Sequence, residues 1–247
     1  MTERPKYDPY SNSLSYARLW TLLPNYAEFK PFVLATRYRL GCKVYDRAGP
    51  CPACYRPSDA LGDHAMCCGH QGERITRHNA IRDAIHDTAA AAALSPVKEG
   101  QHLLPGNNRR PADIYIGGWA AGRDAALDVT VINPLQDATI QGAAVTAGHE
   151  LSVRYNNKMT SAAAACQAEG ITFIPLVFES LGGWEDRAVK ELKKLASALA
   201  RHSGEDEADT WRKLIVRISI LLMKGNTALL SGRIPASPDA ILEEGIV

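Results

Sequence analysis

The spacing of apolar residues changes near residue 96, from a helical period to short strand-like runs. Residues 72–94 carry three isoleucines and an alanine run, which predict a long helix with one buried face. Three short apolar runs with strand character follow, separated by turn sequences. They predict strands at 97–104, 112–116 and 125–132.

The second half of the chain is mostly helical in pattern. The alanine-rich stretch 139–168 predicts a helix, and the apolar run 171–178 predicts a fourth strand. Pro175 cannot donate a ladder hydrogen bond, so this strand should lie at a sheet edge or contain a bulge. Two further helices are expected, at 184–201 and 209–230.

The predicted order is a helix, three strands, a helix, a strand and two helices, which is typical of an α/β domain with helices on the faces of a sheet. Before residue 50, helix-like spacing is interrupted by Pro24 and Pro31, so one or two short helices are expected. We expect four parts: a helical segment at 1–50, a Cys/His-rich segment at 51–70, an α/β domain at 71–203, and a C-terminal helix and tail at 204–247.

Composition narrows the class of protein. The 247 residues are 46% hydrophobic and 22% charged, which is ordinary for a soluble globular chain. The formal net charge is only +1, so a nucleic-acid-binding surface would need locally concentrated positive charge. The sequence lacks an uninterrupted apolar run of membrane-spanning length and the apolar core of a signal peptide. We therefore expect a nuclear or cytoplasmic protein, neither secreted nor embedded in a membrane.

Four of the six cysteines lie between Cys51 and Cys68, and this clustering favours a metal site over disulfides. The spacing Cys51-x2-Cys54-x9-His64-x3-Cys68 suits a tetrahedral zinc ion held by three sulfurs and one nitrogen. A shell closed by four protein ligands leaves no open position. The predicted zinc is therefore structural, and its binding free energy should contribute to local folding.

Other interpretations of this segment remain. Cys67 is an alternative fourth ligand, His70 is a weaker one, and the cysteines could also be unligated thiols. The sequence Pro-Cys-Pro-Ala-Cys also matches half of the zinc deaminase signature, but that chemistry needs an upstream His-x-Glu. The deaminase interpretation fails because no histidine precedes His64.

Asp113 and Asp128 lie on two neighbouring predicted strands, and the glycine-containing sequence between them allows a β-hairpin. A hairpin would bring the two carboxylates together, and such hard oxygen ligands suit Mg²⁺ or Mn²⁺. Asp128 also interrupts an apolar strand, where a buried carboxylate needs a partner. Alternatively, Arg109 or Arg110 pairs with a buried Asp128 and no metal is bound.

A metal-dependent phosphodiesterase also benefits from a cation near the attacking water. Lys158, on the helix after the third strand, could reach the two aspartates, and Arg154 lies one turn earlier on the same face. Alternatively, either side chain is a solvated helix residue. Glu99, on the first predicted strand, could add a third carboxylate.

The ordered set CPAC, GDHAMCC, GERITRHN, RRPADIYI and ALDVTV resembles the restriction-like endonuclease of site-specific non-LTR retrotransposons. That family belongs to the PD-(D/E)XK superfamily, whose core order is helix, three strands, helix, strand. The resemblance covers about residues 32–190. It implies Asp113 and Asp128 as metal ligands, Lys158 as the catalytic lysine, and Cys51, Cys54, His64 and Cys68 as zinc ligands.

The resemblance implies a retrotransposon-derived endonuclease that cuts DNA with Mg²⁺ or Mn²⁺; RNA is an alternative partner, and a homodimer would supply two active sites. The expected nucleic-acid contacts are Arg74, Arg77, His78, Arg109 and Arg110. The Arg77-His78-Asn79 stretch is alternatively structural.

The chain departs from the family pattern at three points. The motif before Asp113 is Pro-Ala-Asp, and Thr130 stands where a strand lysine is expected. The third departure is that no reverse transcriptase accompanies these motifs, so a fragment, a free-standing relative and a domesticated copy are all alternatives. A catalytically inactive nucleic-acid-binding module and a purely structural α/β domain are therefore alternatives.

Overall fold

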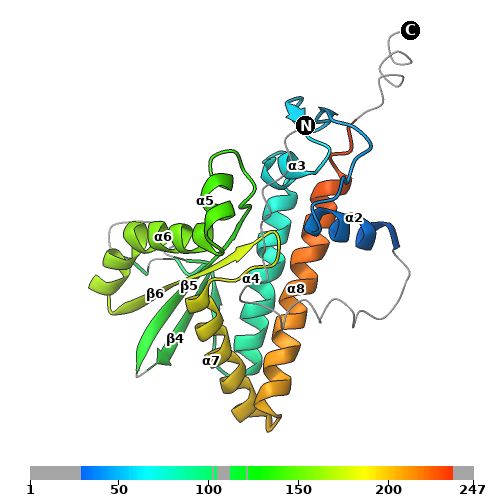
Figure 1. Cartoon of the computed structure of the whole chain (residues 1–247). Coiled ribbons are helices and arrows are strands. Elements are labelled where there is room, and N and C mark those ends of the chain that lie inside the picture. The colour runs from blue at the N-terminus through cyan, green and yellow to red at the C-terminus, as the bar shows by residue number, and fades with distance from the viewer. Residues whose placement is uncertain (1–28, 102, 105–111, 121, 236–247) are drawn as a thin grey trace, which may run out of the picture.

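The computed structural model describes residues 29–101, 103–104, 112–120 and 122–235 (Figure 1). In these residues the chain is a mixed α/β fold. The elements are α2 (Phe29–Arg39), β1 (Gly49–Pro50), β2 (Pro57–Ser58), α3 (Asp63–Cys67), α4 (Glu73–Ala91), β3 (Val97–Lys98), β4 (Ile114–Ala120), β5 (Arg123–Ile132), α5 (Ile140–Val145), α6 (His149–Ala168), β6 (Ile171–Glu179), α7 (Asp186–Ser203) and α8 (Glu207–Ser231).

The main sheet has the strand order β3-β4-β5-β6. β4 pairs with β3 and β5 in antiparallel fashion, whereas β5 and β6 are parallel. A parallel pair needs a long crossover, and α5 and α6 form it. Pro175 lies in β6, at the edge of the described sheet, as its missing N–H predicted.

Helices cover both faces of this sheet. On one face, α4, α7 and α8 bury a core that includes Ile81 of α4 and Leu127 of β5. On the other face, α6 lies against β5 and β6, where Ala126 and Cys166 are buried. Successive side chains of a strand point to opposite faces. Asp128, two residues after Ala126, therefore lies on the α6 face.

The first predicted strand is much shorter than expected. Residues 97–104 were expected to be extended, but β3 ends at Lys98. Glu99 has a φ of 49°, a left-handed conformation that does not continue a strand. The second strand was predicted at 112–116, but β4 continues through Gly117 and Gly118 to Ala120, and its register with β5 is irregular there.

Two helix predictions also need correction. The stretch 139–168 forms two helices, α5 and α6, with Gly148 in a left-handed conformation (φ 71°) at the start of α6. Pro31 does not interrupt the N-terminal helix. It lies in the first turn of α2, where a residue without an N–H is tolerated. Pro24 lies outside the described residues.

Of the described helices, α8 is the one with the length and hydropathy of a membrane-spanning helix. Leu214, Ile218 and Leu222 of α8 are nevertheless buried with α4, α7 and the sheet. This burial makes α8 a core helix. The α/β domain was expected to end at residue 203, but α8 belongs to the same core.

α4 and α8 approach closely where Arg77 crosses between them. Arg77 is 3% exposed, and its Nη1 donates to Asn226 Oδ1 (2.6 Å) and lies 3.8 Å from Met66 Sδ. Burial lowers the pKa of Arg77 to about 10. A Cβ on Gly225 would lie 2.4 Å from Arg77 Cγ, so only glycine fits opposite this arginine.

We predict that Gly225→Ala destabilises the protein. Gly→Ala inside a helix normally stabilises by about 1 kcal/mol, but here the new methyl group meets Arg77, and a loss of about 1–3 kcal/mol is expected. Urea unfolding followed by circular dichroism measures the change. Lys224→Ala, at an exposed neighbouring position, is the matched control. A Gly225→Ala variant more stable than wild type would contradict this packing.

Candidate functional site

Four side chains meet near the N-terminal hairpin of β1 and β2. The ligand atoms of Cys51, Cys54, His64 and Cys68 all lie within 4.8 Å of one another. Cys54 Sγ is 3.2 Å from His64 Nε2. Three sulfurs and one imidazole nitrogen are a typical tetrahedral zinc shell. The cluster can therefore hold a metal ion such as zinc, with the four ligands that the spacing predicted.

Short-range backbone contacts position these ligands. The pairing of β1 with β2 closes the loop that carries Cys51 and Cys54, and the backbone N–H of Cys51 donates to the Arg56 carbonyl (2.9 Å). The Asp59 carboxylate accepts backbone hydrogen bonds at the start of α3, including one from His64 (2.8 Å). Asp59 therefore orients the first turn of α3 and with it the imidazole ligand.

The two alternative ligands lie outside this group of four. Cys67 Sγ accepts a hydrogen bond from Asn133 Nδ2 (3.3 Å), and the backbone carbonyl of His70 accepts one from Arg233. Asn133 follows β5, and its Oδ1 accepts hydrogen bonds from Tyr38 and Ser180 (both 3.1 Å). Cys67 thus helps to attach α3 to the end of the sheet.

The electrostatic environment favours ligation at His64 and Cys68, whereas burial raises the pKa of the Cys51 thiol and opposes it. Burial lowers the pKa of His64, which favours the neutral imidazole that a metal requires. For Cys68, burial alone would raise the thiol pKa. Hydrogen bonds from Arg233 and from the His70 backbone outweigh burial and hold the pKa below its usual value.

A second polar group lies between β5 and α6. Lys158 Nζ of α6 is 2.8 Å from Asp128 Oδ2 of β5, and Thr130 Oγ1 donates to the same oxygen (3.3 Å). Asp113 lies one residue before β4 rather than inside it, but its backbone N–H still donates to Leu127 O (3.0 Å). Because Ile114 pairs with Leu127, one further step of the register places Asp113 opposite Asp128.

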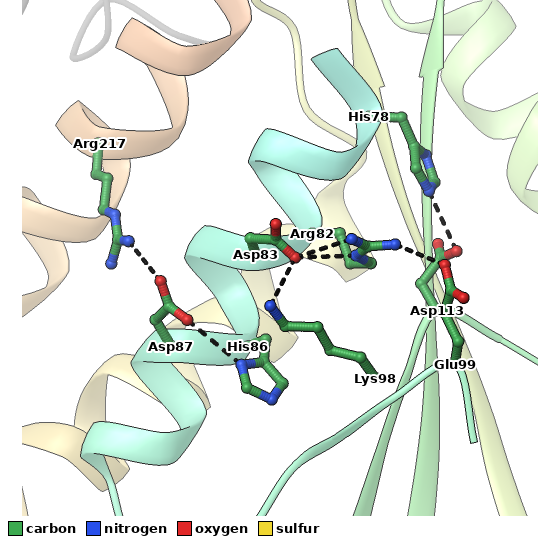
Figure 2. Close-up of polar contacts among 9 residues, drawn as sticks. All are labelled: His78, Arg82, Asp83, His86, Asp87, Lys98, Glu99, Asp113 and Arg217. Carbon is green, nitrogen blue, oxygen red and sulfur yellow. Dashed lines mark hydrogen bonds and ion pairs between the residues drawn. The ribbon is translucent and has the colours of Figure 1, made fainter. Parts of the chain in front are cut away.

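Both carboxylate oxygens of Asp113 are engaged. Oδ2 accepts the backbone N–H of Val129 (2.6 Å), and Oδ1 lies 3.1 Å from His78 Nε2 of α4. Figure 2 shows His78 pointing from α4 toward Asp113 at the start of β4. Contacts from two separate elements therefore hold Asp113 in its orientation.

Asp128 is only partly accessible. Burial raises its pKa, the negative charge of Asp113 adds to this, and the hydrogen bond and positive charge of Lys158 oppose it. The two carboxylates are thus close enough to interact electrostatically. Such an arrangement of a desolvated acid, a second acid and a lysine is typical of functional sites.

Glu99 is close to this site through its backbone. Its N–H donates to the Asp113 carbonyl (2.8 Å), but its carboxylate pairs with Arg82 Nη1 at 2.7 Å (Figure 2). Arg82 also pairs with Asp83, which in turn pairs with Lys98. Within the described residues, Glu99 does not form a three-ligand group with the two aspartates.

Sequence reasoning did not single out Arg82 as a residue of this site. His78 and Arg82 are four residues apart in α4, a spacing that puts both on one helix face toward the start of β4. That spacing was the available signal, but it did not reveal that the face meets Asp113 and Glu99.

The expected nucleic-acid contacts have different environments. Arg74 is exposed, with Nη1 3.1 Å from Cys67 O, and His78 is partly exposed. Arg77 was expected to contact phosphates, but it is buried between α4 and α8, so its role is structural. Arg109 and Arg110 lie outside the described residues. In the described part of the chain, Lys158 supplies the cation beside Asp128, and Arg154 is exposed on α6.

No family model matches this chain, and no curated protein matches its sequence at a significant level. The likeness to retrotransposon endonucleases therefore stays a prediction.

We predict that the purified protein contains one zinc ion per chain and that Cys54→Ser abolishes its binding, because the shell loses a thiolate. Cys67→Ser should retain the metal, since Cys67 lies outside the ligand group. Metal content measured by inductively coupled plasma mass spectrometry decides this. A folded wild-type chain without metal, or equal metal loss in both variants, would contradict the assignment.

Proposed function

We propose that this protein is a metal-dependent DNA endonuclease with a PD-(D/E)XK-like core. One observation carries the proposal: Lys158 Nζ lies 2.8 Å from Asp128 Oδ2, beside a second carboxylate, Asp113, at the facing strand position. Asp113 directly precedes β4, Asp128 lies in β5 and Lys158 lies in α6, so three separate parts of the chain contribute. Their convergence supports a common chemical role.

The arrangement of elements supports the same proposal. α4, β3, β4 and β5 are followed by a helical crossover and the parallel strand β6. This order agrees with the one expected for the PD-(D/E)XK superfamily. Thr130 stands at the strand position of the expected lysine, and Lys158 supplies the amine from α6 instead.

The donor atoms suit a hard divalent ion. Mg²⁺ is usually held by one or two carboxylates and keeps several waters, so Asp113 and Asp128 suffice as protein ligands. The described contacts of Asp128 involve Oδ2, and its other oxygen, Oδ1, remains for a ligand. When bound, Mg²⁺ or Mn²⁺ supplies a water of lowered pKa and neutralises negative charge on the phosphate.

The protein groups then have distinct roles. Asp113, oriented by His78 and the Val129 N–H, and Asp128 bind the ion in their ionised forms. Lys158 donates to a nonbridging phosphate oxygen and stabilises the charge that develops as water attacks phosphorus and the bond to the leaving oxygen breaks. Exposed Arg74 contributes a nonspecific contact to the DNA backbone.

The metal of the cysteine cluster has a different role. In the proposed protein it is a structural zinc ion, because four protein ligands close its shell and leave no position for substrate or water. Phosphodiester chemistry therefore belongs to the two aspartates and Lys158.

We predict that the purified protein nicks supercoiled plasmid DNA in the presence of Mg²⁺ or Mn²⁺. Asp128→Asn and Lys158→Ala should each lower the rate by at least about 100-fold, because each removes charge at the reacting phosphate. Asn157→Ala changes an exposed neighbour of Lys158 and should leave nicking unchanged. Conversion of supercoiled to open-circular DNA on agarose gels measures the rate.

The same protein samples distinguish the alternative functions. If the wild-type protein retains DNA at low salt but never nicks it, the inactive nucleic-acid-binding module replaces the nuclease. Thr130 at the lysine position is the observation that favours this alternative. If DNA is not retained even at low salt, both functions are wrong.

We also predict that Asp128→Asn does not destabilise the fold. The pKa of Asp128 is raised in the folded state, so its stabilising contribution is present below the unfolded-state pKa and is lost as pH rises through the folded-state pKa. Asparagine mimics the protonated carboxyl. At pH 7, without Mg²⁺, the variant should therefore unfold in urea with a free energy equal to wild type or up to about 1 kcal/mol higher.

The matched control for this experiment is Asp124, whose pKa is lowered by a hydrogen bond from Tyr115. Asp124→Asn should change stability in the opposite direction. At about pH 4, near the usual aspartate pKa, the difference between Asp128→Asn and wild type should shrink. A clear loss of stability in Asp128→Asn at pH 7 would show that the pair with Lys158 outweighs the cost of burying the charge.

A further inference from the structure

Arg233, two residues beyond α8, is a fully buried arginine beside the cysteine cluster. Its relative exposure is 0%, and among the described residues it is the largest side chain that is completely buried. A buried guanidinium is costly unless its charge and its donors are matched. The partners of Arg233 therefore show how its buried charge is stabilised.

The partners of Arg233 come from the segment around the start of α4 and from α8 itself. Nη2 donates to the His70 carbonyl and lies 2.9 Å from Glu73 Oε2. Nη1 donates to Leu229 O (3.2 Å), whereas the buried Nε has no hydrogen-bond partner. Glu73 is the described carboxylate that pairs with this arginine, and it is partly exposed to solvent.

The guanidinium also lies close to Cys68, one of the four candidate ligands, because its Nη2 binds the carbonyl of His70, two residues further along the chain. Burial acts to raise the pKa of the Cys68 thiol, but the hydrogen bond and positive charge of Arg233 help to hold that pKa below its usual value. The pKa of Arg233 itself is raised against the effect of burial, first by Glu73 and then by Cys68. This contact joins residues that are far apart in the sequence. It places a fixed positive charge beside a sulfur of the metal cluster.

The net charge of the cluster with a metal ion bound would explain why a positively charged side chain lies beside it. Three thiolates carry more negative charge than one divalent ion neutralises, and Cys51 and Cys68 are buried. Groups around a metal shell that donate hydrogen bonds to the ligands orient them and tune metal affinity. Arg233 has a buried donor without a partner and a charge of the required sign.

We propose that Arg233 is the charge-compensating residue of the metal site: its guanidinium donates a hydrogen bond to the metal-bound thiolate of Cys68 and so couples metal binding to the packing of the C-terminal end of α8. This role of Arg233 is independent of the nuclease activity, and Arg233 lies well outside the Cys/His-rich segment.

Neighbouring contacts support the coupling to α8. The Tyr45 hydroxyl donates to Leu230 O (2.8 Å), and Leu229 and Leu230 are buried in one cluster with Ala65 and Met66 of α3. Figure 1 shows α3 beside the C-terminal end of α8. Loss of the metal should therefore loosen the end of α8 as well as the cysteine loop.

The test compares the 247-residue protein with Arg233→Met, which removes the charge, and Arg233→Lys, which keeps it. Arg77→Met is the matched control, because Arg77 is also a buried arginine between α4 and α8 but pairs with Asn226. Zinc affinity is measured by competition with a chromophoric chelator. The thiolate-to-metal charge-transfer band is measured in the Co²⁺-substituted protein, and circular dichroism verifies folding.

We expect Arg233→Met to weaken zinc binding about 10–100-fold, the usual cost of removing a group that supports a metal ligand. Its Co²⁺ charge-transfer band should shift to longer wavelength, since a thiolate without its hydrogen bond is a better electron donor. Arg233→Lys should recover part of the affinity. Arg77→Met should lose stability but keep the zinc affinity and the band of the wild-type protein.

Two results would overturn the proposal. One is a folded Arg233→Met variant with wild-type zinc affinity and an unshifted band. The other is an equal loss of zinc affinity in Arg77→Met, which would assign the effect to general destabilisation. If Arg233→Met does not fold, Arg233→Gln replaces it, with the same supporting and contradicting outcomes.

Discussion

Ile114 pairs with Leu127 across β4 and β5, and this register determines where the side chains of the candidate site lie. One step further along the pair, Asp113 comes opposite Asp128. The alternation of β5 then sends Leu127 into the core under α4 and α7 and turns Asp128 toward α6. A slip of one residue would exchange these faces, burying the carboxylate in the apolar core, so the core itself enforces the register.

The carboxylates are tolerated near this core because each has a partner from a different layer. α6 brings Lys158 to Asp128, and α4 brings His78 to Asp113 and Arg82 to Glu99 (Figure 2). A carboxylate moved out of water needs such compensation. The pKa of Asp128 is nevertheless raised, because burial outweighs the hydrogen bond and positive charge of Lys158.

The cysteine cluster is joined to the rest of the chain by long-range polar contacts. Asn133, at the end of β5, binds Cys67; Arg77 reaches Met66 from α4; and Arg233 reaches the His70 carbonyl from beyond α8. A small metal-binding segment has little apolar surface of its own to bury. Its docking onto α4, α8 and the sheet supplies the missing contacts, so the cysteine cluster and the main core stabilise one another.

The sequence alone determined the features that depend on short separations. The metal ligands lie within one short segment, so their spacing predicted the cluster. The periodicity predicted α4, α7, α8, β5 and β6 closely. It failed at Glu99, whose left-handed backbone ends β3 early, because an apolar pattern carries no information about a single backbone dihedral angle.

Only the tertiary structure decided which charged side chains meet. Lys158 and Asp128 are thirty residues apart, and the helical crossover that parallel strands require brings them to 2.8 Å. Arg77 and Arg74 look alike in the sequence, yet α8 buries the first and leaves the second exposed. Arg233 carried no local signal at all. The burial of a charge depends on partners from other elements, and those partners are set by packing rather than by sequence spacing.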